Sequence, residues 1–240
     1  MEEKELKTSP KQRIFIALIA VIMLGSMIAG YAAIILGSNN NNNNTSSGIS
    51  EEKKMAYEES YNSKLAEFRK ASQSDFDKFV KFKKAVTAYN ETTANENGVK
   101  TRDYVIGDGR TLKEGDTDYL AYYIGWCADE TIFDSSFNDS SNPTSFDKII
   151  AASSEMVEGW TTGIIGMKLN GIREITVPSS LGYKDQEGVA CGANKPLKFL
   201  VMTKANTGSL ATLYKDLELA YTKYLYATYG IDYDEQFATD

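Results

Sequence analysis

The chain has 240 residues, of which 42% are hydrophobic and 25% are charged, an ordinary composition for a globular protein of one or two domains. Its net charge of -7 excludes nucleic acid as a partner, because there is no basic patch to bind a phosphate backbone. The sequence contains no histidine, so the commonest metal ligand and the commonest general base are both missing.

An uncharged apolar run, Ile14–Leu36, follows a short basic segment at the N-terminus. At about 1.5 Å per residue, this run is long enough to cross a hydrocarbon core of about 30 Å. We therefore expect a retained single-pass membrane anchor over residues 14–37, with a cleaved signal peptide as the alternative. Lysine and arginine precede the run, so the positive-inside rule predicts a cytoplasmic tail over residues 1–13 and places the rest of the chain outside the cytoplasm, at the cell membrane.

The next segment, residues 38–50, contains a run of asparagines followed by Thr, Ser and Gly. It has nothing to bury, and we expect a flexible linker. Residues 51–91 then show a helical seam at four-three spacing, in which every position except Ser72 and Asp75 is apolar. The seam residues are Tyr61, Leu65, Phe68, Ser72, Asp75, Phe79, Phe82, Val86 and Tyr89. This pattern predicts an amphipathic helix that packs on the rest of the chain or, alternatively, on a second copy in a homodimer.

Residues 98–205 have a different texture, with short strand-like runs divided by turns. Tyr119–Trp126 is typical of a buried strand, apolar and polar residues alternate over Ile172–Val177, and a last strand is expected over Leu197–Thr203. Between the first two runs, Trp160 shares one helical face with apolar residues four and seven positions later, which predicts a short helix against a core.

A final amphipathic helix is predicted over residues 207–229, with Thr207 or Ser209 as its N-cap and Gly230 after its end. Its seam matches that of the helix over residues 51–91, so we expect the two helices to pack on each other and to bracket the strand-rich region. The acidic tail over residues 230–240 is expected to fray.

Short motifs follow one another through the strand-rich region in a specific order and spacing. They are Gly107-Asp108-Gly109-Arg110, Tyr122-Tyr123-Ile124-Gly125, Phe133-Asp134-Ser135-Ser136, Glu155-Met156-Val157-Glu158-Gly159-Trp160, Gly171-x-Arg173 and Leu181-Gly182-Tyr183. In this combination the chain resembles an FKBP-type peptidyl-prolyl isomerase over about residues 98–205. The resemblance implies an α+β fold, in which an antiparallel sheet of about five strands wraps around a short helix, here with flanking helices and one N-terminal transmembrane helix.

The resemblance also implies an apolar proline pocket with Trp160 as its floor. The catalytic positions that it carries over are Tyr123, Phe133, Asp134, Val157, Trp160, Tyr183 and Phe199. In the family, the backbone N–H at Val157 and the hydroxyl at Tyr183 donate to substrate carbonyls. Substrate-binding positions are expected at Met156, Phe146 and Ala190. Two positions depart from the family, because Thr144 stands where a pocket aromatic is usual and the loop over residues 184–194 lacks the usual apolar pair.

This chemistry suits a chain without imidazole. Rotation about an X–Pro bond is slow because amide resonance is lost in the twisted state, and an apolar pocket favours the less dipolar twisted amide over the planar one. No nucleophile, metal or cofactor is required. We therefore expect a membrane-anchored isomerase that assists the folding of exported or cell-envelope proteins by binding their proline-containing segments. The alternative is a non-catalytic FKBP-like module, anchored to the membrane, that binds peptides or acts as a chaperone.

The two cysteines, Cys127 and Cys191, both fall in the part of the chain expected outside the cytoplasm, where disulfides persist. If the family fold holds, Cys127 ends a strand that pairs with the last strand, and Cys191 lies in the loop that enters that last strand. A disulfide between them is then geometrically allowed, with two free thiols as the alternative. The bridge would brace the loop over residues 184–194.

Overall fold

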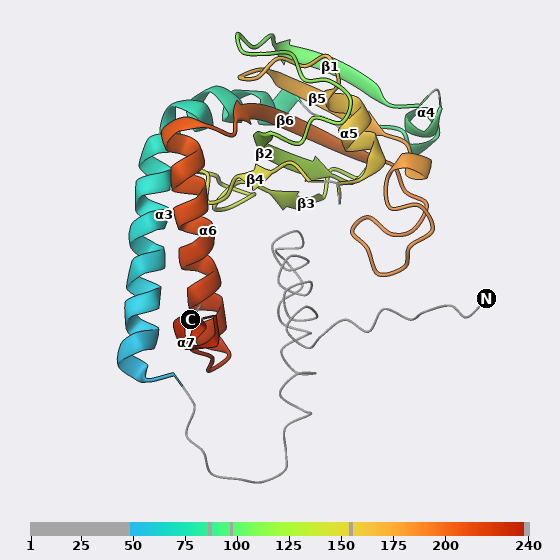
Figure 1. The fold of residues 1–240 in the computed structure, drawn as a ribbon. Helices are drawn as coiled ribbons and strands as arrows, with labels where there is room; N and C mark the ends of the chain where they lie inside the picture. Colours follow the sequence, from blue (N-terminus) through green and yellow to red (C-terminus); the bar gives the residue numbers. More distant parts are fainter. Residues whose placement is uncertain (1–48, 86–87, 97, 154–155, 238–240) are drawn as a thin grey trace, which may run out of the picture. The chain divides into compact units, whose positions relative to one another are not determined.

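The computed structural model describes residues 49–85, 88–96, 98–153 and 156–237 (Figure 1). Its helices are α3 (Glu51–Phe79), η1 (Val80–Ala85), α4 (Glu91–Asn95), α5 (Glu158–Ile164), η2 (Ser179–Leu181), α6 (Gly208–Thr228) and α7 (Tyr233–Gln236). Its strands are β1 (Lys100–Val105), β2 (Tyr119–Trp126), β3 (Ile132–Ser135), β4 (Ile150–Ala151), β5 (Ile172–Val177) and β6 (Leu197–Ala205). The predicted tail, anchor and most of the linker lie outside the described residues.

The membrane-spanning part of the predicted fold is wrong. The run Ile14–Leu36 lies outside the described residues, and none of the helices that the structure describes has the length and apolar character needed to cross a bilayer. The two long helices, α3 and α6, carry charged residues on their exposed faces, among them Glu58 and Glu59 of α3 and Lys215 of α6. The predicted localisation as a single-pass membrane protein depended on a spanning helix. It is wrong for the same reason, since none of the described helices could cross a bilayer. The antiparallel sheet with flanking helices fits the prediction.

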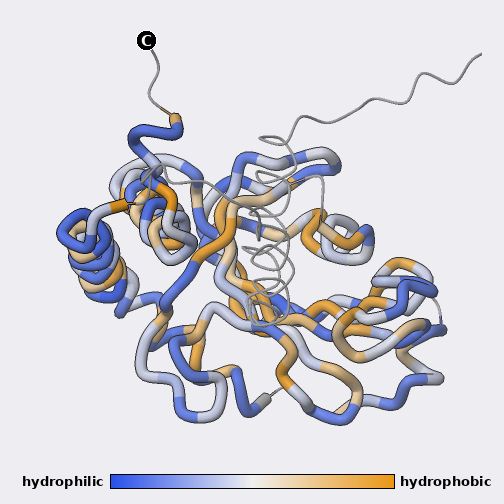
Figure 2. The backbone as a smooth tube through the Cα atoms, turned by 90° about the horizontal axis from the view of Figure 1, so that it is seen from below, coloured by the Kyte–Doolittle hydropathy of each residue, from blue (hydrophilic) through white to orange (hydrophobic). Residues whose placement is uncertain are grey.

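β2 lies inside an antiparallel sheet with the strand order β1-β5-β6-β2-β3, and β4 pairs with β2 beside β3. Every residue of β2 is buried, because its side chains alternate between two hydrophobic clusters on opposite faces of the sheet. Tyr119, Ala121 and Tyr123 enter one cluster, and Leu120, Tyr122, Ile124 and Trp126 enter the other. Figure 2 shows the hydrophobic stretches gathered in these strands, whereas the turns of the long helices carry hydrophobic and hydrophilic residues.

One face of the sheet is covered by α5, which packs directly on β5. A Cβ atom added at Gly159 would lie 2.2 Å from Cγ1 of Val177, and one added at Gly163 would lie 2.3 Å from Cγ2 of Ile175. The two glycines therefore let the helix backbone approach the strand closely. Arg173 of β5 ties down the end of α5, because its Nη1 donates to the carbonyls of Gly163 and Ile165 at 3.0 Å.

The opposite face is covered by α3, and α6 packs along α3 and reaches the same cluster (Figure 1). The α3 residues buried there are Leu65, Phe68, Phe76 and Phe79. Tyr61 of α3 stacks on Tyr224 of α6, with 5.4 Å between ring centroids. The seam of α3 is thus occupied by the chain's own sheet and by α6, so the predicted packing of the two helices accounts for it without a second copy.

The helix predicted over residues 51–91 is interrupted. α3 ends at Phe79 and continues as the 3-10 helix η1 to Ala85, and the separate helix α4 begins after Asn90. The Asn90 side chain accepts from the backbone N–H of Thr93 at 3.0 Å, so this residue begins a new helix.

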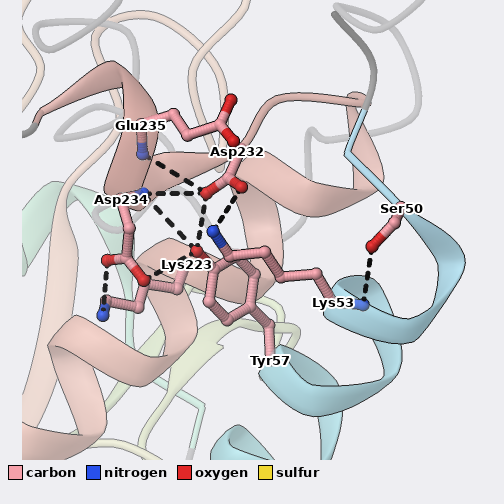
Figure 3. A network of polar contacts seen from close by, with 7 residues as sticks. All are labelled: Ser50, Lys53, Tyr57, Lys223, Asp232, Asp234 and Glu235. Carbon is pink, nitrogen blue, oxygen red and sulfur yellow. Dashed lines mark hydrogen bonds and ion pairs between the residues drawn. The ribbon is translucent and has the colours of Figure 1, made fainter.

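The C-terminal segment does not fray over its described part. Asp232 caps α7 by accepting from the backbone N–H groups of Asp234 and Glu235. It also pairs with Lys53 at the start of α3 and accepts from the Tyr57 hydroxyl at 2.9 Å, while Asp234 pairs with Lys223 of α6 at 2.7 Å (Figure 3). The network joins the start of α3 and the end of α6, which we call their distal ends, to α7. It is made by residues that are far apart in sequence.

Candidate active site

Trp160 lies at the centre of an aromatic cluster on the α5 face of the sheet. Only 3% of the residue is exposed, and its indole Nε1 donates to the Tyr119 hydroxyl at 3.0 Å. Tyr123 meets the indole edge-on at 5.8 Å between centroids, and Phe199 does so at 5.2 Å. Phe133 of β3 adds an edge contact to Phe199 at 5.7 Å. Strands β2, β3 and β6 thus bring their aromatics together against one helix, as expected for an apolar floor with fixed ring geometry.

A carboxylate lies at the edge of this cluster. Asp134 accepts from the Tyr123 hydroxyl through Oδ2 and from the backbone N–H of Ser135 through Oδ1 at 2.8 Å. The Lys148 ammonium approaches the same Oδ1 to 2.5 Å. Burial, and then the negative charge of Asp134, hold the pKa of Tyr123 well above its usual value, so its hydroxyl stays protonated as a donor.

Two donors beside the cluster have no acceptor among the described residues. Val157 precedes α5, and its backbone N–H makes no hydrogen bond within that part of the chain. The hydroxyl of Tyr183, just after η2, likewise has no hydrogen-bond partner within the ranges that the structure describes. Burial, and then the charge of Asp134, raise the pKa of Tyr183, so its proton is retained. Both residues pack against the aromatic cluster, where a ligand carbonyl could accept from them.

The predicted catalytic residues are therefore brought together, and the three predicted substrate-binding residues fare differently. Met156 packs against the same cluster, at its margin. Ala190 is half-buried in its loop, and the structure brings it into neither cluster around the sheet.

The placement of Phe146 must be corrected, because this residue lies on the opposite face of the sheet. It is fully buried there and stacks on Tyr122 at 4.0 Å and on Phe137 at 5.7 Å. A bridge between the backbones of Phe137 and Phe146 turns both rings the same way, toward Phe76 and Phe79 of α3. The hydroxyl of Thr144 accepts from the Asn138 side chain at 3.0 Å within the same loop, so neither position supplies a ring to the Trp160 cluster.

The structure joins Cys127 to Cys191 by a disulfide, with 5.3 Å between the Cα atoms. Cys127 follows β2, and Cys191 lies in the loop between η2 and β6, partly buried against the aromatic cluster. The bridge therefore fixes to the sheet the loop that begins directly after Tyr183.

Sequence reasoning missed two residues of the site, Lys148 and Tyr119. Tyr119 begins a strand that was predicted, yet no motif pointed to its hydroxyl as the acceptor for Trp160. Lys148 follows Phe146 in a loop without periodicity, so no pattern indicated the direction of its side chain. Among the described residues, no group of His, Cys, Asp and Glu side chains could hold a metal ion.

An antiparallel sheet that packs around one short helix, with an aromatic floor and two donors that lack an acceptor among the described residues, fits a domain of the prolyl isomerase class. Residues 109–204 match the family model described as FKBP-type peptidyl-prolyl cis-trans isomerase. This stretch of the chain, which carries the aromatic cluster, is similar to that family.

The chain is also similar to individual proteins. FK506-binding protein 4 of Gibberella zeae is 32% identical over 150 residues, which cover 62% of this chain and 28% of that protein. The chloroplastic peptidyl-prolyl cis-trans isomerase FKBP19 of Arabidopsis thaliana is 31% identical over 153 residues, covering 58% of each chain. The crystal structure of AtFKBP13 aligns with 48% of this chain and 96% of its own at 25% identity and a TM-score of 0.35. The chain spans 28% and 58% of the length of the two curated relatives.

Proposed function

We propose that this protein catalyses cis-trans isomerisation of X–Pro bonds in polypeptides. The observation that carries the proposal is a pair of donors, Val157 N–H and the Tyr183 hydroxyl, which pack against the aromatic cluster around Trp160 and have no acceptor among the described residues. A proline ring is apolar and suits the aromatic floor. The backbone carbonyls next to the proline can accept hydrogen bonds from the two donors.

The chemistry needs only modest stabilisation of the twisted amide. The barrier to rotation about the peptide bond is about 18–20 kcal/mol, and each tenfold in rate requires about 1.4 kcal/mol. An apolar site that excludes water disfavours the planar, more dipolar amide relative to the twisted one. The two donors would hold the bent peptide in place, which lowers the entropic part of the barrier.

The test is a proline-isomerisation assay on the full chain with a Leu-Pro tetrapeptide. We expect catalysis by the wild type and a loss of at least about tenfold in the double variant Tyr183→Ala, Asp134→Asn, in line with the cost of misplacing substrate-positioning groups. A matched control makes the same two changes away from the site, Tyr229→Ala directly after α6 and Asp77→Asn on α3, and should keep the wild-type rate. Wild-type rates no higher than those of the active-site variant would overturn the proposal.

A second function is favoured by one observation, the burial of Phe146 on the opposite face of the sheet. Thr144 has no ring and bonds to Asn138 within its own loop, and Phe146 packs into the other core cluster, so neither residue supplies an aromatic side chain to the rim. A site with an intact floor and a reduced rim would suit a non-catalytic module that holds proline-containing peptides. Binding of the tetrapeptide, measured by calorimetry, without any acceleration of its isomerisation would favour this alternative.

The clients are a further part of the proposal. Disulfides persist in oxidising environments, where exported proteins fold. The Cys127–Cys191 bridge is therefore an argument that the substrates are exported proteins. Protein isolated from its native source should then carry the bridge. Recovery of both cysteines as free thiols under trapping conditions would count against exported clients.

A further inference from the structure

Lys148 touches two residues of the proposed site at once. Its ammonium lies 2.5 Å from Oδ1 of Asp134 and 5.3 Å from the centroid of the Tyr123 ring. Tyr123 donates in turn to the other oxygen of the same carboxylate. The three side chains therefore form a closed triangle, in which Lys148 fixes the orientation of both the acid and the ring.

The triangle is partly withdrawn from water. The side chain of Asp134 is 19% exposed and that of Lys148 is 30% exposed. Fully exposed ion pairs contribute little to stability, because solvent screens them and their side chains move freely. The Lys148–Asp134 pair is better shielded than such pairs. Asp134 also accepts from the Ser135 backbone, so its carboxylate is held from three directions. The Tyr123 ring meets Trp160 edge-on, so a shift of this ring would reach the floor of the site.

The backbone that carries Lys148 is anchored from several sides. The backbone N–H of Asp147 donates to the Ser136 carbonyl at 2.9 Å, and Phe146 is fully buried against α3. Arg69 of α3 pairs with Asp147 in a bidentate arrangement, with Nε to Oδ1 at 2.8 Å and Nη2 to Oδ2 at 2.6 Å. Such forked pairs fix geometry more firmly than a point charge does.

We propose that Lys148 is a positioning residue of the isomerase site, which orients Asp134 and Tyr123, and that α3 holds it in place through the Arg69–Asp147 pair. Lys148 lies within residues 109–204, which match the family, but the sequence motifs assign it no role. The helix that holds it in place, α3, lies outside those residues. The inference rests on the proposed function, because it assigns a role in the same reaction.

The experiment compares variants of the full chain in the tetrapeptide isomerisation assay. Lys148→Met should lower kcat and kcat/KM together by about tenfold, since it removes an interaction that orients groups for the transition state. Lys148→Arg keeps the charge and should recover most of the rate. Arg69→Met should give a smaller loss of about threefold, because it acts through Asp147. Lys64→Met, which removes another ion-paired cation on α3, should leave the rate unchanged.

A double-mutant cycle separates positioning from a general effect of charge. If Lys148 acts through Asp134, the change Lys148→Met costs nothing further in an Asp134→Asn background. An equal loss in both backgrounds, or a wild-type rate in Lys148→Met, overturns the inference while leaving the proposed function standing. A wild type without isomerase activity overturns both. Melting temperatures are measured throughout, and should Lys148→Met fail to fold, an Arg69→Met variant that keeps the rate of Lys64→Met would overturn the inference.

Discussion

The indole Nε1 of Trp160 donates a hydrogen bond to the hydroxyl of Tyr119 at 3.0 Å, and both residues are buried. The bond joins the helix at the floor of the site to Tyr119, the first residue of β2. It fixes the rotation of the indole, which makes T-shaped contacts with the rings of Tyr123 and Phe199. Burial raises the pKa of Tyr119 to about 12, so the hydroxyl is neutral at all physiological pH values.

Tyr119→Phe removes the acceptor and leaves the indole N–H buried without a partner. We expect a loss of about 1–3 kcal/mol in the free energy of unfolding, the desolvation cost of such a group. Urea denaturation followed by circular dichroism measures this loss.

Tyr122, the next tyrosine in β2, supplies the matched control for Tyr119→Phe. The Tyr122 hydroxyl is buried on the opposite face and has no hydrogen-bond partner among the described residues. Tyr122→Phe should therefore be neutral or slightly stabilising, since it removes a polar atom that was already unpaired. Equal losses in the two variants would contradict the role given to the Trp160–Tyr119 bond.

The close packing of α5 on β5 gives a second prediction. Gly159→Ala would bring a methyl group within 2.2 Å of Cγ1 of Val177, so the helix must shift away from the strand. Overpacking of this kind costs about 1–3 kcal/mol, and the displaced Trp160 should also lower kcat/KM. Val177→Ala in the same chain makes room and should restore part of both losses. A double variant that is less stable than the sum of the single changes would argue against a direct clash.

Much of this fold and site follows from the sequence, and the exceptions share a physical cause. Strand β2 was predicted with its observed bounds, because tyrosine and leucine fill a buried run of fixed length. Trp160 and Tyr183 were identified by motifs, in which local spacing fixes a local backbone. Phe146 and Lys148 lie in a loop, where no periodicity tells which way a side chain points. The described part of the tail is held by pairing across 175 residues between Tyr57 and Asp232, which no local pattern encodes.

The disulfide is expected to support both stability and the site. Closing a loop between residues 64 apart in sequence corresponds to about 4 kcal/mol in the chain-entropy model. The variant Cys127→Ala, Cys191→Ala should lose about 2–4 kcal/mol in urea denaturation. Its kcat/KM should also fall, because the loop that begins after Tyr183 is no longer held to β2.

Reduction of the wild type supplies the comparison for that variant. Treatment with dithiothreitol should bring the wild type to the stability of the double variant, while the variant itself should not respond to the reductant. A wild type that keeps its unfolding midpoint after complete reduction would show that the bridge does not stabilise the fold.

The network at the distal end of α3 and α6 predicts a loss of stability in acid (Figure 3). Burial acts to raise the pKa of Asp232, but hydrogen bonds from Lys53 and Tyr57 outweigh it, so the pKa lies below the ordinary 3.8. A carboxyl group whose pKa is depressed in the folded state stabilises the fold at pH values above its pKa in the unfolded state. This stability is lost as the pH falls through the pKa of the folded state.

Asp232→Asn keeps a residue that can cap α7 but removes the charge. Its melting temperature should be lower than that of the wild type at pH 7, and the difference should shrink below pH 3.8. Asp77→Asn, an exposed change on α3, serves as the control and should match the wild type throughout. A difference between Asp232→Asn and the wild type that persists unchanged in acid would assign the loss to the shape of the side chain instead of its charge.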